Sequence, residues 1–174
     1  MKPQHYFVMI DSCAVDRFAK SPFDPVMELR NTEFKLVFTL DLKQEYENAL
    51  QEHVPTCHEA RQLIRRILSE GTVRGFFGFG GRPYSGWNEG DWIEPDQVQL
   101  VSKRLNEASQ NRPGKRTDLH LVALAKHDIV ITANIKENHW NQAPKGEGQV
   151  IQWRELEFFL AREVNLASAL RRLL

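Results

Sequence analysis

Residues 6–12 decide the fold of this chain; they are Tyr6-Phe7-Val8-Met9-Ile10-Asp11-Ser12. An uninterrupted apolar run ends here directly in an acid. A short continuous apolar run bounded by polar residues is typical of a strand that is buried on both faces of a parallel sheet. The stretch therefore predicts an α/β fold in which Asp11 stands at the carboxyl end of the first strand.

Further apolar runs follow along the chain, over residues 36–40 and 129–133, with a weaker one over 150–153. Helical patterns lie between and after them, and we expect helices near residues 42–51, 56–70, 97–107, 119–126 and 155–172. Strands that alternate with helices in this way predict a mainly parallel central sheet covered by helices. The expected architecture is a three-layer α/β/α sandwich that forms one domain over residues 1–174.

Several of these helices have recognisable start signals. Asp24 precedes Pro25, which suits the first position of a helix. Asp41 is placed to cap the helix that begins at residue 42, and Thr56-Cys57-His58-Glu59 has the spacing of a capping box. We therefore expect side-chain caps at Asp24, Asp41 and Thr56.

Composition narrows the class of protein. The chain has 174 residues, of which 41% are hydrophobic, and its 23 basic residues balance 23 acidic ones. This apolar content excludes a disordered chain, and the apolar runs are far shorter than the roughly 20 residues of a membrane-spanning helix. The start of the sequence lacks a signal-peptide core, so the expected location is cytoplasmic, with Cys13 and Cys57 as free thiols.

Residues 71–95 differ from the rest because they are rich in glycine and aromatic residues. We expect an inserted loop or hairpin here, without the Gly-Lys-Ser/Thr signature of a phosphate-binding loop. Arg74 and Arg82 are interleaved with its aromatic residues, an arrangement that suits stacking on unpaired bases; an ordered loop held by its aromatic residues is the alternative. Lys115 and Arg116 are further candidates for contacts to a phosphate backbone.

Three acids are placed where the carboxyl ends of the expected strands meet. Asp11 follows the first strand, Glu45 lies in the helix after the second, and Asp118 opens the helix that leads to the third. Such carboxylates repel one another unless a cation sits among them, and an oxygen-only cluster favours Mg²⁺ or Mn²⁺ and the hydrolysis of phosphodiesters. Each acid also has a structural interpretation: Asp11 as a turn former, Glu45 as a solvated helix residue and Asp118 as an N-cap.

The order of these motifs is similar to that of the PIN-domain nucleases. The resemblance lies in the first strand ending in Asp11-Ser12, in Phe38-Thr39 followed six positions later by Glu45, and in the Thr117-Asp118 helix start. It continues in Ile129-Val130-Ile131-Thr132-Ala133-Asn134 and in the closing segment 150–160, and it covers nearly the whole chain apart from residues 71–95.

The resemblance implies a set of site residues. Asp11, Glu45 and Asp118 would be the catalytic, metal-binding acids, and Thr132 would support them through a hydrogen bond. The fourth acid of the family's fuller pattern is Asn134 in this chain. An amide oxygen can coordinate a hard cation but lacks the charge of a carboxylate, so a weaker second metal position is expected.

The function that the resemblance implies is that of a metal-dependent endoribonuclease with Mg²⁺ or Mn²⁺ as cofactor. RNA is the expected substrate, and DNA is the other polymer that the residues allow. Small PIN-like domains of this kind resemble the toxins of toxin–antitoxin pairs, which often form homodimers restrained by an antitoxin protein. The alternative is a catalytically weak or inactive nucleic-acid-binding or scaffolding protein, which Asn134 favours.

Overall fold

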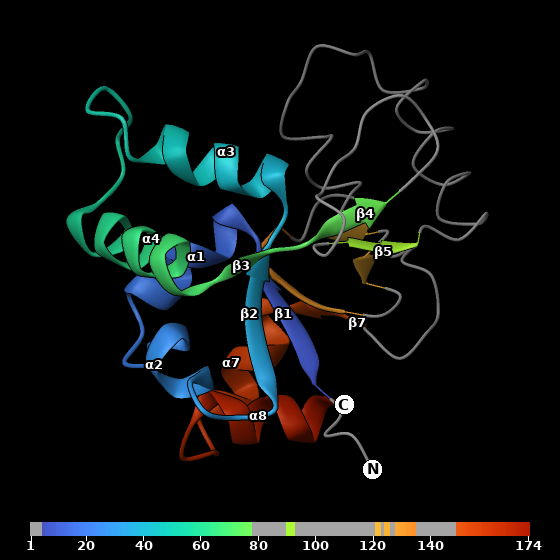
Figure 1. Cartoon of the computed structure of the whole chain (residues 1–174). Helices are drawn as coiled ribbons and strands as arrows, with labels where there is room; N and C mark the ends of the chain where they lie inside the picture. Colours follow the sequence, from blue (N-terminus) through green and yellow to red (C-terminus); the bar gives the residue numbers. More distant parts are fainter. Residues whose placement is uncertain (1–4, 78–89, 93–120, 123, 126–127, 135–148) are drawn as a thin grey trace.

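A computed structural model of the chain describes residues 5–77, 90–92, 121–122, 124–125, 128–134 and 149–174. Its centre is a five-stranded sheet in the order β3-β2-β1-β6-β7, and every neighbouring pair of strands is parallel. The strands are β1 (Tyr6–Ile10), β2 (Phe34–Phe38), β3 (Thr72–Val73), β6 (Ile129–Thr132) and β7 (Gln149–Gln152). The expectation of a mainly parallel central sheet is therefore confirmed (Figure 1).

The first strand occupies the middle of this sheet. Val8, Met9 and Ile10 are fully buried, because β1 has β2 on one side and β6 on the other. Ile10 is in register with Ile131 of β6, so the two strands end within one residue of each other. This register brings the residues that follow β1 and β6 to one edge of the sheet.

Six helices fall within the described residues: α1 (Ser12–Ala19), α2 (Pro25–Leu29), α3 (Leu40–Ala49), α4 (His58–Glu70), α7 (Trp153–Leu160) and α8 (Leu166–Leu173). Helix α1 contacts α3 and α4, whereas α8 contacts α7 and α2. In Figure 1 the α3–α4 pair lies in the upper left of the view and the red α7–α8 pair in its lower part. The arrangement is a mixed α/β fold compatible with a three-layer sandwich. None of the described helices is long and apolar enough to cross a membrane.

The strand and helix around residues 34–49 begin earlier than expected. The strand ends at Phe38, and α3 starts at Leu40, because the Thr39 hydroxyl accepts a hydrogen bond from the Leu42 N–H over 3.0 Å. Asp41 therefore lies in the first turn of the helix and is not its cap, so that prediction was wrong. A threonine that follows a buried strand can end the strand and cap a helix with one side chain.

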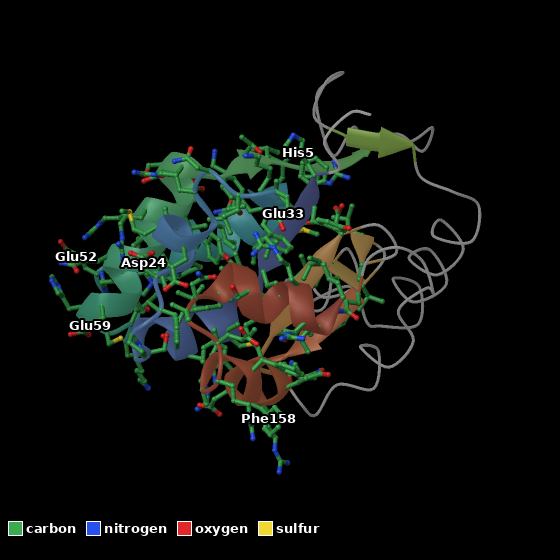
Figure 2. The ribbon with its side chains drawn as sticks, turned by 90° about the horizontal axis from the view of Figure 1, so that it is seen from below. His5, Asp24, Glu33, Glu52, Glu59 and Phe158 are labelled. Carbon is green, nitrogen blue, oxygen red and sulfur yellow. The ribbon has the colours of Figure 1, made fainter. Side chains whose placement is uncertain are left out.

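The other two caps have different outcomes. Asp24 accepts hydrogen bonds from the N–H groups of Val26 and Met27, which confirms the cap of α2. The expected capping box at Thr56 was wrong, because Cys57 is the N-cap of α4 and its side chain forms no cap bond. Helix α4 still runs to Glu70, since its buried face packs into the core. Asp24 and the first turn of α4, marked by Glu59, lie on the same side of the molecule (Figure 2).

The C-terminal helical segment is divided into two helices, where a single helix over 155–172 was expected. The side chain of Asn165 accepts a hydrogen bond from the Ser168 N–H over 2.8 Å and starts α8 anew. Val164 lies in the connection between the two helices and is 91% exposed, although the apolar spacing of the segment continues through it. A favourable N-cap therefore outweighs continuation of the apolar pattern.

The glycine-rich segment is only partly described. Its start forms β3, an edge strand of the main sheet, where an inserted loop was expected. Two further short strands, β4 (Gly75–Phe77) and β5 (Gly90–Trp92), pair in parallel, which is not the arrangement of a hairpin. The expected helix near residues 97–107 lies outside the described residues, and of the one near 119–126, residues 121, 122 and 124 are helical.

Candidate metal centre at the carboxyl edge of the sheet

Asp11 is a buried acid at the junction of β1 and α1. Its backbone is extended, and its carbonyl oxygen accepts the N–H groups of Ala14 and Val15, so the residue stands at the N-cap position. Its side chain forms no cap hydrogen bond, and the residue is only 3% exposed. The carboxylate is therefore used for tertiary contacts, and the interpretation of Asp11 as a turn former alone does not account for it.

Two donors hold one oxygen of this carboxylate. The Thr132 hydroxyl donates to Asp11 Oδ2 over 2.6 Å, and the Cys13 thiol donates to the same oxygen over 2.7 Å. Thr132 is fully buried at the end of β6, and Cys13 lies in the first turn of α1. The carboxyl ends of the neighbouring strands β1 and β6 are therefore joined by a hydrogen bond to the Asp11 carboxylate.

Glu45 approaches the same place from α3. The Ser12 hydroxyl donates to Glu45 Oε2 over 2.9 Å and lies 3.5 Å from Asp11 Oδ1. Glu45 is half-buried on the inner side of its helix, whereas Glu47, two residues later, is exposed. The structure therefore brings Asp11 and Glu45 to the two sides of one hydroxyl group.

Tyr46 fixes the helix that carries Glu45. Its side chain is fully buried, and its hydroxyl donates a hydrogen bond to the Ile10 carbonyl. Burial, together with the negative charges of Asp11 and Glu45, raises the pKa of Tyr46 well above its ordinary value. The phenol consequently stays protonated and keeps its role as a donor.

Cys13 has the properties of a hydrogen-bond donor. Burial, followed by the charge of Asp11 and the hydrogen bond to it, raises the pKa of the Cys13 thiol to about 12. Burial is the larger cause, and the acidic neighbour Asp11 adds to it. A thiol that stays protonated at neutral pH is a poor nucleophile and a poor metal ligand.

The remaining predicted site residues are placed as follows. Asn134 is half-buried just after β6, and its N–H donates to Thr132 Oγ1 over 3.1 Å. Arg74 forms a bidentate ion pair with the buried carboxylate of Asp128, and its guanidinium lies over the ring of Phe7. Its guanidinium is thus held within the protein, and its contact to nucleic acid stays a prediction. The others, Asp118, Arg82, Lys115 and Arg116, lie outside the described residues.

The donor set suits a hard cation. Asp11, Glu45 and Ser12 present oxygen atoms from two elements, and oxygen ligands are those that Mg²⁺ and Mn²⁺ prefer. Among the described residues no three His, Cys, Asp or Glu side chains gather around one point, and the third predicted acid lies outside this part of the chain. The residues present therefore fit part of such a site.

Sequence reasoning missed Ser12 and Tyr46 as members of this site. Ser12 directly follows the first acid, and this adjacency is a local signal that a hydroxyl stands at the strand end. Tyr46 gave no such signal, because its partner is a backbone carbonyl 36 positions earlier in the chain.

No model of a known protein family matches the sequence, and no curated protein matches it. The PIN-like character of the fold therefore stays a prediction, and a function has to be argued from the geometry of the site itself.

Proposed function

We propose that this protein is a PIN-like endoribonuclease that depends on Mg²⁺ or Mn²⁺. The observation that carries the proposal is the meeting of Asp11 and Glu45 across the Ser12 hydroxyl. The two acids come from different elements and lie at the carboxyl edge of a parallel sheet, which is where open α/β sheets bind their ligands. Bringing two carboxylates together costs free energy, and a divalent cation between them would lower that cost.

The residues of the chain have separate tasks in this proposal. Asp11 and Glu45 hold the cation, with Asp118 and Asn134 as the further ligands that the family resemblance implies. A bound divalent cation would make a water molecule more acidic and neutralise charge on the phosphodiester. Thr132 fixes the direction of the Asp11 carboxylate, and Ser12 does the same for Glu45.

The alternative function is nucleic-acid binding or scaffolding with weak or no catalysis. The observation that favours it is Asn134, which stands where the family's fuller pattern has an acid. An amide supplies one neutral oxygen, so a second cation would bind weakly there. RNA as substrate, an antitoxin-like partner and a homodimer all come from the family resemblance and stay predictions.

The first experiment is cleavage of labelled single-stranded RNA and DNA in Mn²⁺, Mg²⁺ or EDTA. We expect the wild-type protein to cut RNA only with metal, and Asp11→Ala and Glu45→Gln to abolish cutting. Glu47→Gln is the matched control, because Glu47 is an exposed acid on the same helix. Asn134→Asp is tested as well, and the alternative function would be favoured if this variant cut RNA and the wild-type protein did not. Metal-dependent cutting that survives Asp11→Ala would show that the proposed site is wrong.

A further inference from the structure

The two oxygens of Asp11 have different surroundings. Oδ2 receives hydrogen bonds from Thr132 and Cys13, which are both neutral donors. Oδ1 lies on the side of Ser12, whose hydroxyl donates to the second acid, Glu45. The carboxylate is therefore oriented, with one oxygen toward the end of β6 and the other toward α3.

Both donors on Oδ2 are supported in turn by the backbone after β6. The Ala133 N–H donates to Cys13 Sγ over 3.2 Å, and the Asn134 N–H donates to Thr132 Oγ1 over 3.1 Å. A hydroxyl or thiol that accepts a hydrogen bond from a backbone N–H directs its own proton elsewhere. Here the thiol of Cys13 and the hydroxyl of Thr132 both donate to Asp11 Oδ2. Two consecutive backbone N–H groups thus act on a single carboxylate oxygen through one sulfur and one oxygen atom.

We propose that Cys13 is a positioning residue of this site. Together with Thr132 it holds Oδ2 of Asp11, and it thereby directs Oδ1 toward the cation that Asp11 shares with Glu45. The inference rests on the proposed function and deepens it, because it assigns a task to a residue that does not itself bind the metal.

The physical basis is preorganisation of a metal ligand. Carboxylates that ligate metals are usually held by hydrogen bonds from a surrounding layer of residues, and loss of one such partner typically weakens metal binding or activity by about 10- to 100-fold. Because Thr132 remains in place when only Cys13 is changed, we expect a loss near the lower end of this range. A serine at position 13 keeps an O–H donor, whereas an alanine removes the donor altogether.

The experiment compares Cys13→Ala and Cys13→Ser with the wild-type protein and with Cys57→Ala. Cys57 is the matched control, because it is exposed at the start of α4 and its side chain forms no cap bond there. Mn²⁺ affinity is measured by calorimetric titration, and cleavage of labelled single-stranded RNA is measured as a function of Mn²⁺ concentration. Thermal unfolding in EDTA shows that each variant is folded.

We expect Cys13→Ala to weaken Mn²⁺ binding about 10-fold and to raise the Mn²⁺ concentration for half-maximal cleavage by the same factor. The rate at saturating Mn²⁺ should be recovered, and Cys13→Ser and Cys57→Ala should resemble the wild-type protein. If Cys13→Ala fails to fold, a folded Cys13→Ser that binds Mn²⁺ like the wild-type protein supports the inference, and one that binds 10-fold more weakly overturns it.

The same data separate this inference from the proposed function. Folded Cys13→Ala that binds Mn²⁺ as tightly as Cys57→Ala overturns the role of Cys13 and leaves the nuclease intact. A wild-type protein whose Mn²⁺ binding is absent, or is unchanged by Asp11→Asn, overturns the metal site itself and the role of Cys13 with it.

Discussion

The hydroxyl of Tyr46 donates a hydrogen bond to the backbone carbonyl of Ile10, and this contact joins the two elements that carry the acids of the site. Tyr46 directly follows Glu45 in the sequence, and Ile10 directly precedes Asp11. One buried bond therefore sets the distance between the helix and the strand, one residue away from each acid.

Tyr46→Phe tests the contribution of this hydrogen bond to stability. The substitution keeps the ring but leaves the buried Ile10 carbonyl without its donor, so we expect a loss of about 1–2 kcal/mol in the free energy of unfolding. Urea denaturation measures it, with Tyr6→Phe at the half-buried start of β1 as the control. A Tyr46→Phe variant as stable as the control would show that the bond contributes nothing net.

Glu45→Gln should make the stability of the protein nearly independent of added metal. In EDTA the variant should stay folded, because an amide oxygen can still accept the Ser12 hydrogen bond and one of two neighbouring negative charges is removed. Added Mn²⁺ should raise the stability of the wild-type protein by about 2.7 kcal/mol at 100 times its Kd and have little effect on the variant. Thermal unfolding with and without Mn²⁺ measures both effects. Glu47→Gln should respond to Mn²⁺ like the wild-type protein, and an equal response from Glu45→Gln would argue against metal binding by Glu45.

Cys13 should resist alkylation in the metal-free protein. With a pKa of about 12, roughly one thiol in ten thousand is ionised at pH 8, and the thiolate is the reactive form. Cys57 is exposed and should react first. Mass spectrometry after treatment with iodoacetamide measures both sites, and Cys57→Ala isolates the slower one. Labelling of Cys13 at the same rate in the native and the urea-unfolded protein would contradict the expectation.

Glu33 and Arg171 should make stability depend on pH in the acidic range. Glu33, in front of β2, accepts two hydrogen bonds from Arg171 of α8, which lower its pKa to about 2 from its ordinary 4.5 (Figure 2 labels Glu33). Because the folded pKa is the lower one, the contribution is complete above about pH 4.5 and disappears as the pH falls toward 2. Arg171 is 52% exposed, so we expect only about 1 kcal/mol.

Urea denaturation of Glu33→Gln at pH 7 and at pH 2.5 checks this prediction. The difference from the wild-type protein should be present at pH 7 and mostly absent at pH 2.5. Glu163→Gln is the control, since its partner Arg172 is 71% exposed and the pair is longer, at 3.3 Å. Equal differences at both pH values would mean that Glu33 acts through packing and not through its charge.

Gly71 should not tolerate a side chain. A Cβ atom there would lie 2.8 Å from the Ile67 carbonyl oxygen and 2.9 Å from the Phe38 ring. The carbonyl belongs to the last turn of α4 and cannot move aside cheaply, so Gly71→Ala should cost about 1–3 kcal/mol. Thermal unfolding measures it, with Arg65→Ala on the exposed face of α4 as the control. Equal melting temperatures would show that the helix end can yield.

The parts of the fold that follow from local burial were predictable. The run that became β1 was predicted at its observed bounds, and the end of β6 to within one residue, because strands buried on both faces must be apolar throughout. The two-residue strand β3 is too short to give such a pattern. The break before α8 was hidden, because the apolar spacing continues across it while Asn165 starts a new helix.

The site was predictable only where it depends on the topology. Parallel strands bring their carboxyl ends to one edge, which was enough to expect Asp11 near Glu45. The contacts of Ser12 and Cys13 depend on how β1 and α1 are set against α3 and β6, and residues far apart in the sequence determine this setting. No local pattern of residues contains that information.

The sheet order also determines when the site can be assembled during synthesis. Strand β1 pairs on one side with β2, which ends at Phe38, and on the other with β6, which begins only at Ile129. The pair of Asp11 and Glu45 can therefore form early on a growing chain, whereas Thr132 and the two supporting N–H groups arrive when most of the chain has been made. Contacts between such distant segments are slow to form. A nascent or truncated chain would thus carry Asp11 and Glu45 without the Thr132 hydrogen bond and the two backbone N–H groups that orient the Asp11 carboxylate.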